Sequence, residues 1–150
     1  MSLIAKENQR QFYRLTLDPP LCSDMTIVQI KGKSLETGDA RVLIEDLGPG
    51  GLRFLSTLSL IKSTQVVLEF KTEVMGEFLK MHGYIVRAAE LTDEIMEYGV
   101  QFTMGEEEMA QISRLINRLA IRLRQNRNLP SGRFLTGDRL TFLKAEKDEF

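Results

Sequence analysis

The sequence predicts a mostly β protein, in which short antiparallel strands form a barrel or a sandwich and a single long helix follows. From residue 26 to residue 103, apolar and polar residues alternate with a period of two, as in strands that bury one face. Turn-forming residues interrupt this pattern at short intervals, and the period afterwards becomes helical. We favour a barrel, because closure leaves no strand edge exposed.

The first expected elements are an N-terminal arm and an extended segment. We expect residues 1–9 to form a flexible arm and residues 12–17 to be extended. Pro19 and Pro20 are expected to stop this segment, because proline lacks the amide hydrogen that a strand ladder needs. The following strands contain the alternating pairs or runs Val28 and Ile30, Val42 and Ile44, Leu52 and Phe54, Val66 to Phe70, and Met96 to Phe102. Turns are expected at residues 31–33, 37–39, 49–51, 73–77 and 91–93.

A helix is expected after the last strand, ending near residue 127. Thr103 and Glu106 fit a capping box, with Thr103 as the N-cap. Glutamates open the segment and arginines close it, which complements the helix macrodipole. The apolar residues that recur at helical spacing are Met109, Ile112, Leu115, Ile116, Leu119 and Leu123.

The end of the chain divides it into a barrel domain, residues 1–127, and a C-terminal extension of unknown role, residues 128–150. Pro130 and Gly132 end the helix. The extension holds more apolar residues than a purely solvating tail needs: Phe134, Leu135, Leu140, Phe142, Leu143 and Phe150. It is therefore expected to dock on the barrel, to cover the functional site or to contact a second chain, as in a homo-oligomer.

Composition excludes several classes of protein. A chain of 150 residues is the size of one domain, and its net charge of -1 argues against a DNA-binding or RNA-binding protein, which needs a basic face. No apolar stretch approaches the ~20 residues of a membrane helix, and the N-terminus lacks a signal-peptide pattern. The single cysteine, Cys22, permits no intrachain disulfide and indicates a reducing, cytoplasmic location.

The same inventory argues against an enzyme. The chain has one cysteine, Cys22, and one histidine, His82, so these two residues are the only ones that could form a Cys-His nucleophile pair. Nothing in the sequence places the two together, and we interpret His82 as an ordinary strand side chain. There is no Cys/His spacing for zinc and no phosphate-binding loop. We therefore expect no catalytic residue, no metal and no cofactor.

Two short segments carry the functional information. The first, Arg10-Gln-Phe-Tyr-Arg14, places two guanidinium groups four residues apart beside aromatic rings. The second, Asp46-Leu-Gly-Pro-Gly-Gly51, is a carboxylate followed by a glycine-rich turn between two apolar runs. Pro49 followed by Gly50 favours a type II turn, and glycines let the main chain approach a ligand closely.

These segments, in this order, resemble the RxxxR and (D/N)xSxxG motifs of PilZ domains, the bacterial receptors for cyclic di-GMP. The resemblance covers roughly residues 8–127 and extends to Gly-Gly-Leu-Arg-Phe54 and Tyr98-Gly-Val-Gln-Phe102. It implies a six- or seven-stranded antiparallel PilZ-type β-barrel with a C-terminal α-helix, without catalytic activity. The chain would be a stand-alone PilZ protein with the ligand between the N-terminal arm and the barrel surface.

The resemblance also implies which residues bind the ligand, namely Arg10, Arg14, Asp46, Gly48 and Gly51. Arginine forks onto guanine O6 and N7 or clamps a phosphate, and a carboxylate accepts from guanine N1–H and the exocyclic amine. Gly48 departs from the family, which usually has serine there. The missing hydroxyl removes a hydrogen bond worth ~0.5–1.5 kcal/mol, which would weaken the site.

Two functions remain open at this point. The first is a non-catalytic cyclic di-GMP receptor whose arm orders on binding and presents a new surface to an unidentified protein partner. The alternative is a degenerate PilZ scaffold that acts as a protein-interaction module without nucleotide binding. Gly48 and the apolar extension favour this alternative.

Overall fold

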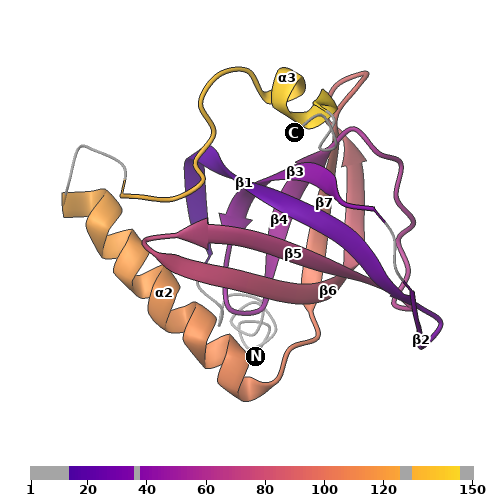
Figure 1. Ribbon diagram of the computed structural model, residues 1–150, viewed down its shortest axis with the longest axis horizontal. Helices are drawn as coiled ribbons and strands as arrows, with labels where there is room; N and C mark the ends of the chain where they lie inside the picture. The colour runs from indigo at the N-terminus through magenta and orange to yellow at the C-terminus, as the bar shows by residue number, and fades with distance from the viewer. Residues whose placement is uncertain (1–13, 36–37, 126–129, 146–150) are drawn as a thin grey trace, which may run out of the picture.

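The computed structural model describes residues 14–35, 38–125 and 130–145 of the chain. Figure 1 shows a strongly curved sheet with one long helix beside it and a short helix near the C-terminus. The strands are β1 (Leu15–Ile30), β2 (Lys33–Ser34), β3 (Ala40–Leu47), β4 (Gly51–Ser56), β5 (Val66–Val74), β6 (Glu77–Glu90) and β7 (Met96–Phe102). The helices are α2 (Glu106–Gln125) and α3 (Arg139–Lys144).

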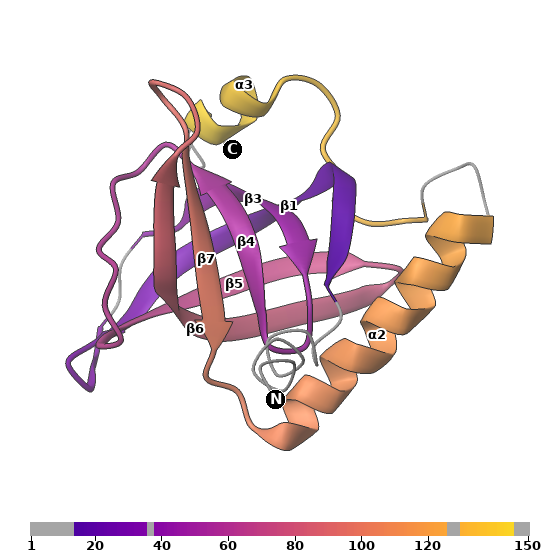
Figure 2. The same ribbon diagram turned by 180° about the vertical axis from the view of Figure 1, so that it is seen from behind.

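All strand pairs are antiparallel, and the sheet closes on itself. The order is β2-β1-β3-β4-β7-β6-β5, and a further pairing of β1 with β5 joins the two sides. Six strands therefore form a closed barrel (Figure 2), and β2 only extends the end of β1 (Figure 1). The predicted mostly β architecture, an antiparallel barrel with a C-terminal helix, is confirmed.

The prediction that the two prolines stop the first strand is wrong. β1 runs for 16 residues through Pro19 and Pro20. Its register against β3 shifts between Thr16 and Leu21, so the prolines lie in an irregular stretch between two regular ladders. A missing amide hydrogen costs no ladder bond at such a point, which is why proline is tolerated there.

The barrel interior is filled by aromatic and aliphatic side chains, and α2 closes one end of it. Phe54 packs against Phe70 and Tyr98 with ring centroids 5.0 and 5.2 Å apart. The residues of α2 that are buried in this core are Ile112, Leu115, Ile116, Leu119 and Ala120. None of the helices described is both long and apolar enough to cross a membrane.

The helix begins two residues later than predicted. The amide of Thr103 donates to the carbonyl of His82 at 3.0 Å, so Thr103 extends the strand ladder and does not cap the helix. The carboxylate of Glu108 instead accepts from the amide of Gly105 at 3.0 Å. This is the carboxylate half of a capping box centred on Gly105.

The first part of the C-terminal extension docks between β1 and β5. The amide of Cys22 donates to the carbonyl of Arg133 at 2.7 Å, and that of Leu135 donates to the carbonyl of Pro20 at 2.8 Å. On the side of β5, the amide of Met75 donates to the carbonyl of Ser131 at 2.7 Å. Of the three expected roles for the extension, the structure therefore shows docking on the barrel.

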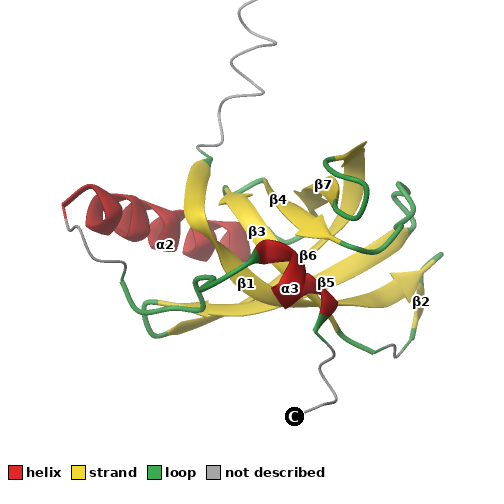
Figure 3. Cartoon of the chain, turned by 90° about the horizontal axis from the view of Figure 1, so that it is seen from above, coloured by secondary structure: helices red, strands yellow, loops and turns green. Residues whose placement is uncertain are grey.

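The second part of the extension, α3, lies over β3 on the outside of the barrel (Figure 3). The carboxylate of Asp138 caps this helix by accepting from the amide of Thr141 at 2.9 Å. A second apolar cluster, outside the barrel core, lies under the extension. It consists of Cys22, Leu43, Leu55, Ile95, Leu135 and Leu143.

Truncation of a buried leucine in the extension should destabilise the whole domain. Leu135 is 7% exposed, and Leu135→Ala is expected to lower the free energy of unfolding by ~2–4 kcal/mol in urea denaturation. Leu91 is 50% exposed, so Leu91→Ala, the matched control, should change it by less than ~0.5 kcal/mol. Equal effects of the two variants would show that the extension does not share the cooperative core.

Candidate functional site

The candidate site is centred on the carboxylate of Asp46, near the end of β3. Its side chain is 13% exposed and lies between two guanidinium groups. Arg14, which directly precedes β1, donates from Nη1 to Oδ1 at 3.1 Å. Arg53, on β4, donates from Nε to Oδ2 at 2.9 Å. Thr16 of β1 pairs with Asp46, and this register brings Arg14 to the site.

Arg53 connects this carboxylate to two others. Its Nη1 donates to Glu97 at 2.7 Å and lies 3.3 Å from Glu45. Burial alone would lower the pKa of Arg53, but the hydrogen bonds to Asp46 and Glu97 outweigh burial and raise it. Arg53 therefore stays charged and holds the side chain of Asp46 in place from the β4 side.

The role of Arg53 was not predicted from the sequence, although the sequence contains a signal for it. Asp46 and Arg53 lie opposite each other in the β3–β4 hairpin. Pairing the two strands around the glycine turn places opposite charges on facing positions, a combination that stabilises antiparallel strands. The role of Glu97 has no comparable local signal, because β7 is distant in the sequence.

The turn between β3 and β4 is closed by backbone hydrogen bonds. The amide of Gly48 donates to the carbonyl of Gly51 at 2.9 Å, and the carbonyl of Gly50 accepts from the amide of Phe102 at 3.0 Å. The amide of Gly48 is therefore already used within the turn.

Glycine at position 51 is required by a close approach of two backbones. A Cβ there would lie 2.1 Å from the carbonyl oxygen of Val100 and 3.3 Å from Nη2 of Arg14. The first distance is far below any real contact of a Cβ, so β4 could not pair with β7 at this point. The second distance shows that the guanidinium of Arg14 lies directly above Gly51.

The structure therefore brings together three of the five predicted ligand-binding residues, Arg14, Asp46 and Gly51. Gly48 lies in the adjoining turn, and Arg10 lies outside the described residues. A guanidinium has five N–H donors and each carboxylate oxygen has two lone pairs. Arg14, whose side chain is 41% exposed, can thus hold Asp46 with one nitrogen and offer others to an anion or a guanine edge.

Cys22 and His82 are not brought together as a nucleophile pair in the structure. Cys22 belongs to the outer apolar cluster, and burial raises the pKa of its thiol although Arg133 and Arg41 act in the opposite direction. A thiol kept protonated is a poor nucleophile. His82 instead contacts Glu69 through Nε2 at 2.8 Å. Within the described ranges, no group of three or more His, Cys, Asp or Glu residues is placed to hold a metal ion.

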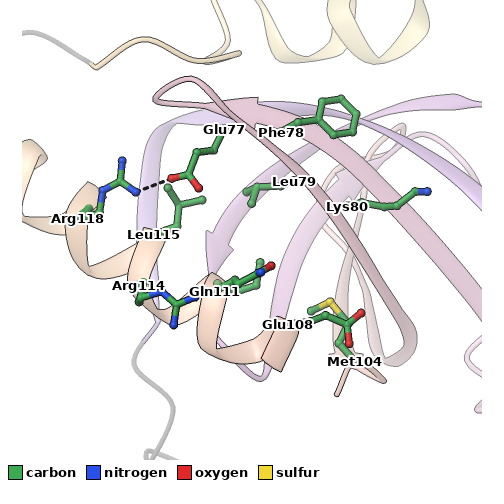
Figure 4. Close-up of a pocket in the computed structure, with 11 residues that line it drawn as sticks. Glu77, Phe78, Leu79, Lys80, Met104, Glu108, Gln111, Arg114, Leu115 and Arg118 are labelled. Carbon is green, nitrogen blue, oxygen red and sulfur yellow. Dashed lines mark hydrogen bonds and ion pairs between the residues drawn. The ribbon is translucent and has the colours of Figure 1, made fainter. Parts of the chain in front are cut away.

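A separate hollow of about 340 Å³ lies between the β5–β6 hairpin and α2 (Figure 4). Its walls carry the ion pair of Glu77 with Arg118, 2.5 Å long, together with Phe78 and Lys80. None of the residues at the Asp46 site lines this hollow. We therefore take the Asp46 site, rather than the hollow, as the candidate functional site.

Comparison with known proteins places these features in a family. The family model described as the PilZ domain matches residues 8–118. Among curated proteins, none matches this sequence.

Solved structures share the fold at low sequence identity. Escherichia coli YcgR in complex with c-di-GMP has a TM-score of 0.57 and 18% identity, covering 78% of this chain and 48% of that one. The Bacillus subtilis inhibitor of motility, MotI or DgrA, has a TM-score of 0.55 and 13% identity. This match covers 79% of this chain and 53% of that one. The PilZ domain of Escherichia coli YcgR with c-di-GMP has a TM-score of 0.52 and 17% identity. This match covers 78% of this chain and 95% of that one. The match thus spans about half the length of the first two proteins.

A methyl group at position 51 should disrupt the hairpin that carries the site. Gly51→Ala is expected to lower the free energy of unfolding by about 3 kcal/mol or more, because the added Cβ meets a backbone oxygen that cannot move freely. No atom lies within 4 Å of a Cβ at Gly38, so Gly38→Ala is the matched control and should change stability little. Urea unfolding followed by circular dichroism measures both, and native stability of Gly51→Ala would contradict the close approach.

Proposed function

The chain belongs to the PilZ domain family, and we propose that it is a non-catalytic receptor for cyclic di-GMP that passes the signal to a protein partner. The observation that carries this proposal is the convergence of Arg14, Asp46 and Gly51 at one end of the β3–β4 hairpin. These residues come from the two motifs that imply nucleotide binding, and the two motifs are far apart in the sequence. Two related structures, those of YcgR and its PilZ domain, contain c-di-GMP.

In the proposed mechanism, Arg14 is the residue that exchanges partners. Without ligand it contacts Asp46 at 3.1 Å, and its partial exposure lets it turn outward. A phosphate or guanine edge of cyclic di-GMP would take up its free donors, and Arg10, four residues earlier, would supply the second guanidinium. Asp46 would then accept from guanine N1–H and the exocyclic amine.

Arg53 has a positioning role in this mechanism. It contacts Asp46 on the oxygen that Arg14 does not use. When Arg14 turns to the ligand, Arg53 still compensates the charge of Asp46 and keeps the carboxylate oriented. The site would therefore stay formed during the exchange.

We place the receptor in the cytoplasm, where the thiol of Cys22 stays reduced.

The alternative function, a degenerate scaffold that binds only protein, is favoured by one observation in the turn. Gly48 offers no side-chain hydroxyl, and its amide is already bonded to the carbonyl of Gly51. If the missing hydroxyl and the occupied amide together abolish nucleotide binding, the fold would serve as a protein-interaction module.

Removal of either motif arginine should weaken binding of cyclic di-GMP. Arg14→Ala and Arg10→Ala are each expected to raise the Kd about 10- to 100-fold, since each loses a charge-assisted hydrogen bond. Isothermal titration calorimetry at moderate salt, with GTP and cyclic di-AMP as competitor controls, measures this. Arg124→Ala, an exposed arginine on α2, is the matched control and should bind normally. Unchanged affinity in both motif variants would contradict the proposal.

A serine at position 48 separates the two candidate functions. If the native protein is a receptor, Gly48→Ser should tighten binding by up to about tenfold, the value of one added hydrogen bond. If the native protein shows no heat of binding and Gly48→Ser creates it, the degenerate scaffold is the correct function. Gly38→Ser, in a loop with open space around it, controls for a general effect of glycine replacement.

A further inference from the structure

An apolar pocket of about 160 Å³ lies under the loop that follows β4. β4 begins at Gly51, beside the candidate ligand site, and ends at Ser56, where the loop over this pocket begins. The pocket lies between β1, the loop of residues 57–65, β5 and β6. Apolar side chains form nearly all of its wall, among them Ile27, Ile30, Leu60, Ile61, Val66 and Ile85.

The loop over the pocket is held in place by a buried tyrosine. The hydroxyl of Tyr98 donates to the carbonyl of Leu58 at 2.6 Å and accepts from the amide of Leu60 at 2.9 Å. Tyr98 is itself 1% exposed in the barrel core. At the other end of the loop, the amide of Lys31 donates to the carbonyl of Gln65 at 2.8 Å. The pocket is thus formed before any partner arrives, which lowers the entropic cost of binding.

The rim of the pocket is apolar and exposed. Of the lining residues, Ile61 is 71% exposed and Ile30 is 40% exposed. A concave apolar site with large exposed aliphatic side chains at its edge is the arrangement that receives an anchoring side chain in protein interfaces.

The two segments that supply most of the pocket wall carry only basic charges. Residues 27–34 and 57–68, which supply most of its wall, include three lysines and no aspartate or glutamate. Lys31 and Lys62 directly follow Ile30 and Ile61 in the chain, and Lys33 pairs with Ile30 across the β1–β2 hairpin. All three lysines are exposed, in a chain whose net charge is -1.

We propose that this basic pocket surface, formed by the apolar pocket with Lys31, Lys33 and Lys62, binds an acidic segment of a partner protein that inserts one large apolar side chain. The lysines attract and orient the acidic segment, and the pocket receives its anchor. A lipid surface fits less well, because a concave pocket suits a single side chain whereas a bilayer needs a flat or protruding apolar face. The inference rests on the proposed function, because it assigns the partner-binding face of the same receptor.

The position of this surface leaves the candidate ligand site free. None of Arg14, Asp46 and Gly51 lines the pocket, so the nucleotide and the partner segment can bind to the same chain together. Tyr98 links them physically, since its ring packs on Phe54, the neighbour of Arg53 in β4, while its hydroxyl holds the pocket loop.

The test uses the isotopically labelled full chain and a short capped peptide of aspartates and glutamates with one central leucine. We expect the peptide to shift the methyl resonances of Ile30, Ile61 and Ile85. The double variant Lys31→Glu/Lys62→Glu should weaken binding at least about tenfold. Lys144→Glu, an exposed lysine on α3, is the matched control and should bind as the native chain does.

Three outcomes would overturn the inference. The first is the absence of these methyl shifts at millimolar peptide. The second is equal binding of a peptide with serine in place of leucine, which would leave only charge attraction. The third is binding to vesicles containing anionic lipid but not to the peptide, which would make the surface a membrane contact.

The same samples distinguish failure of this inference from failure of the proposed function. Cyclic di-GMP is titrated into the native chain, Arg14→Ala and the lysine double variant. Normal nucleotide binding by the double variant, without peptide binding by the native chain, rejects the surface alone. Peptide binding by the native chain and by Arg14→Ala, without any nucleotide binding, rejects the receptor and leaves the surface in place.

Discussion

The pairing of one long strand with two different neighbours organises this molecule. β1 pairs with β3 along its first part and with β5 along its second part, and this double pairing closes the barrel. Its two ends also define the two surfaces of functional interest. At its beginning, the register of Thr16 with Asp46 brings Arg14 to the candidate ligand site. At its end, Ile30 reaches the apolar pocket.

The electrostatics of the candidate site follow from the partial burial of Asp46. A carboxylate with so little exposure needs compensation, and two guanidinium groups supply it from opposite sides. The two contacts differ in kind. Arg53 is fixed by three carboxylates, whereas Arg14 is 41% exposed and, among the residues that the structure describes, contacts one. A half-exposed ion pair is worth ~0–1 kcal/mol, so an anionic ligand with better geometry can displace it at little cost.

The C-terminal extension is connected to the same group of charges. Arg139, at the start of α3, lies 3.6 Å from Glu45, and Glu45 also contacts Arg53. The extension thus packs its leucines on the outer apolar cluster and places a basic residue beside the carboxylates of β3. It lies beyond the 8–118 region that the PilZ family model matches, so it is a feature of this chain in addition to the family fold.

Local patterns in the sequence determined the strands, the amphipathic helix and the two motifs, because alternation, helical spacing and turn residues act within a few positions. Four features depended on tertiary structure, because they arise between segments far apart in the chain. β1 continues through Pro19 and Pro20 only because its register against β3 changes there. Gly51 is required because the backbone of β7 passes so close, and Arg53 is fixed because Glu97 arrives from β7. The docking of Leu135 likewise needed the assembled sheet, since the surface that receives it combines Cys22 of β1, Leu43 of β3 and Leu55 of β4.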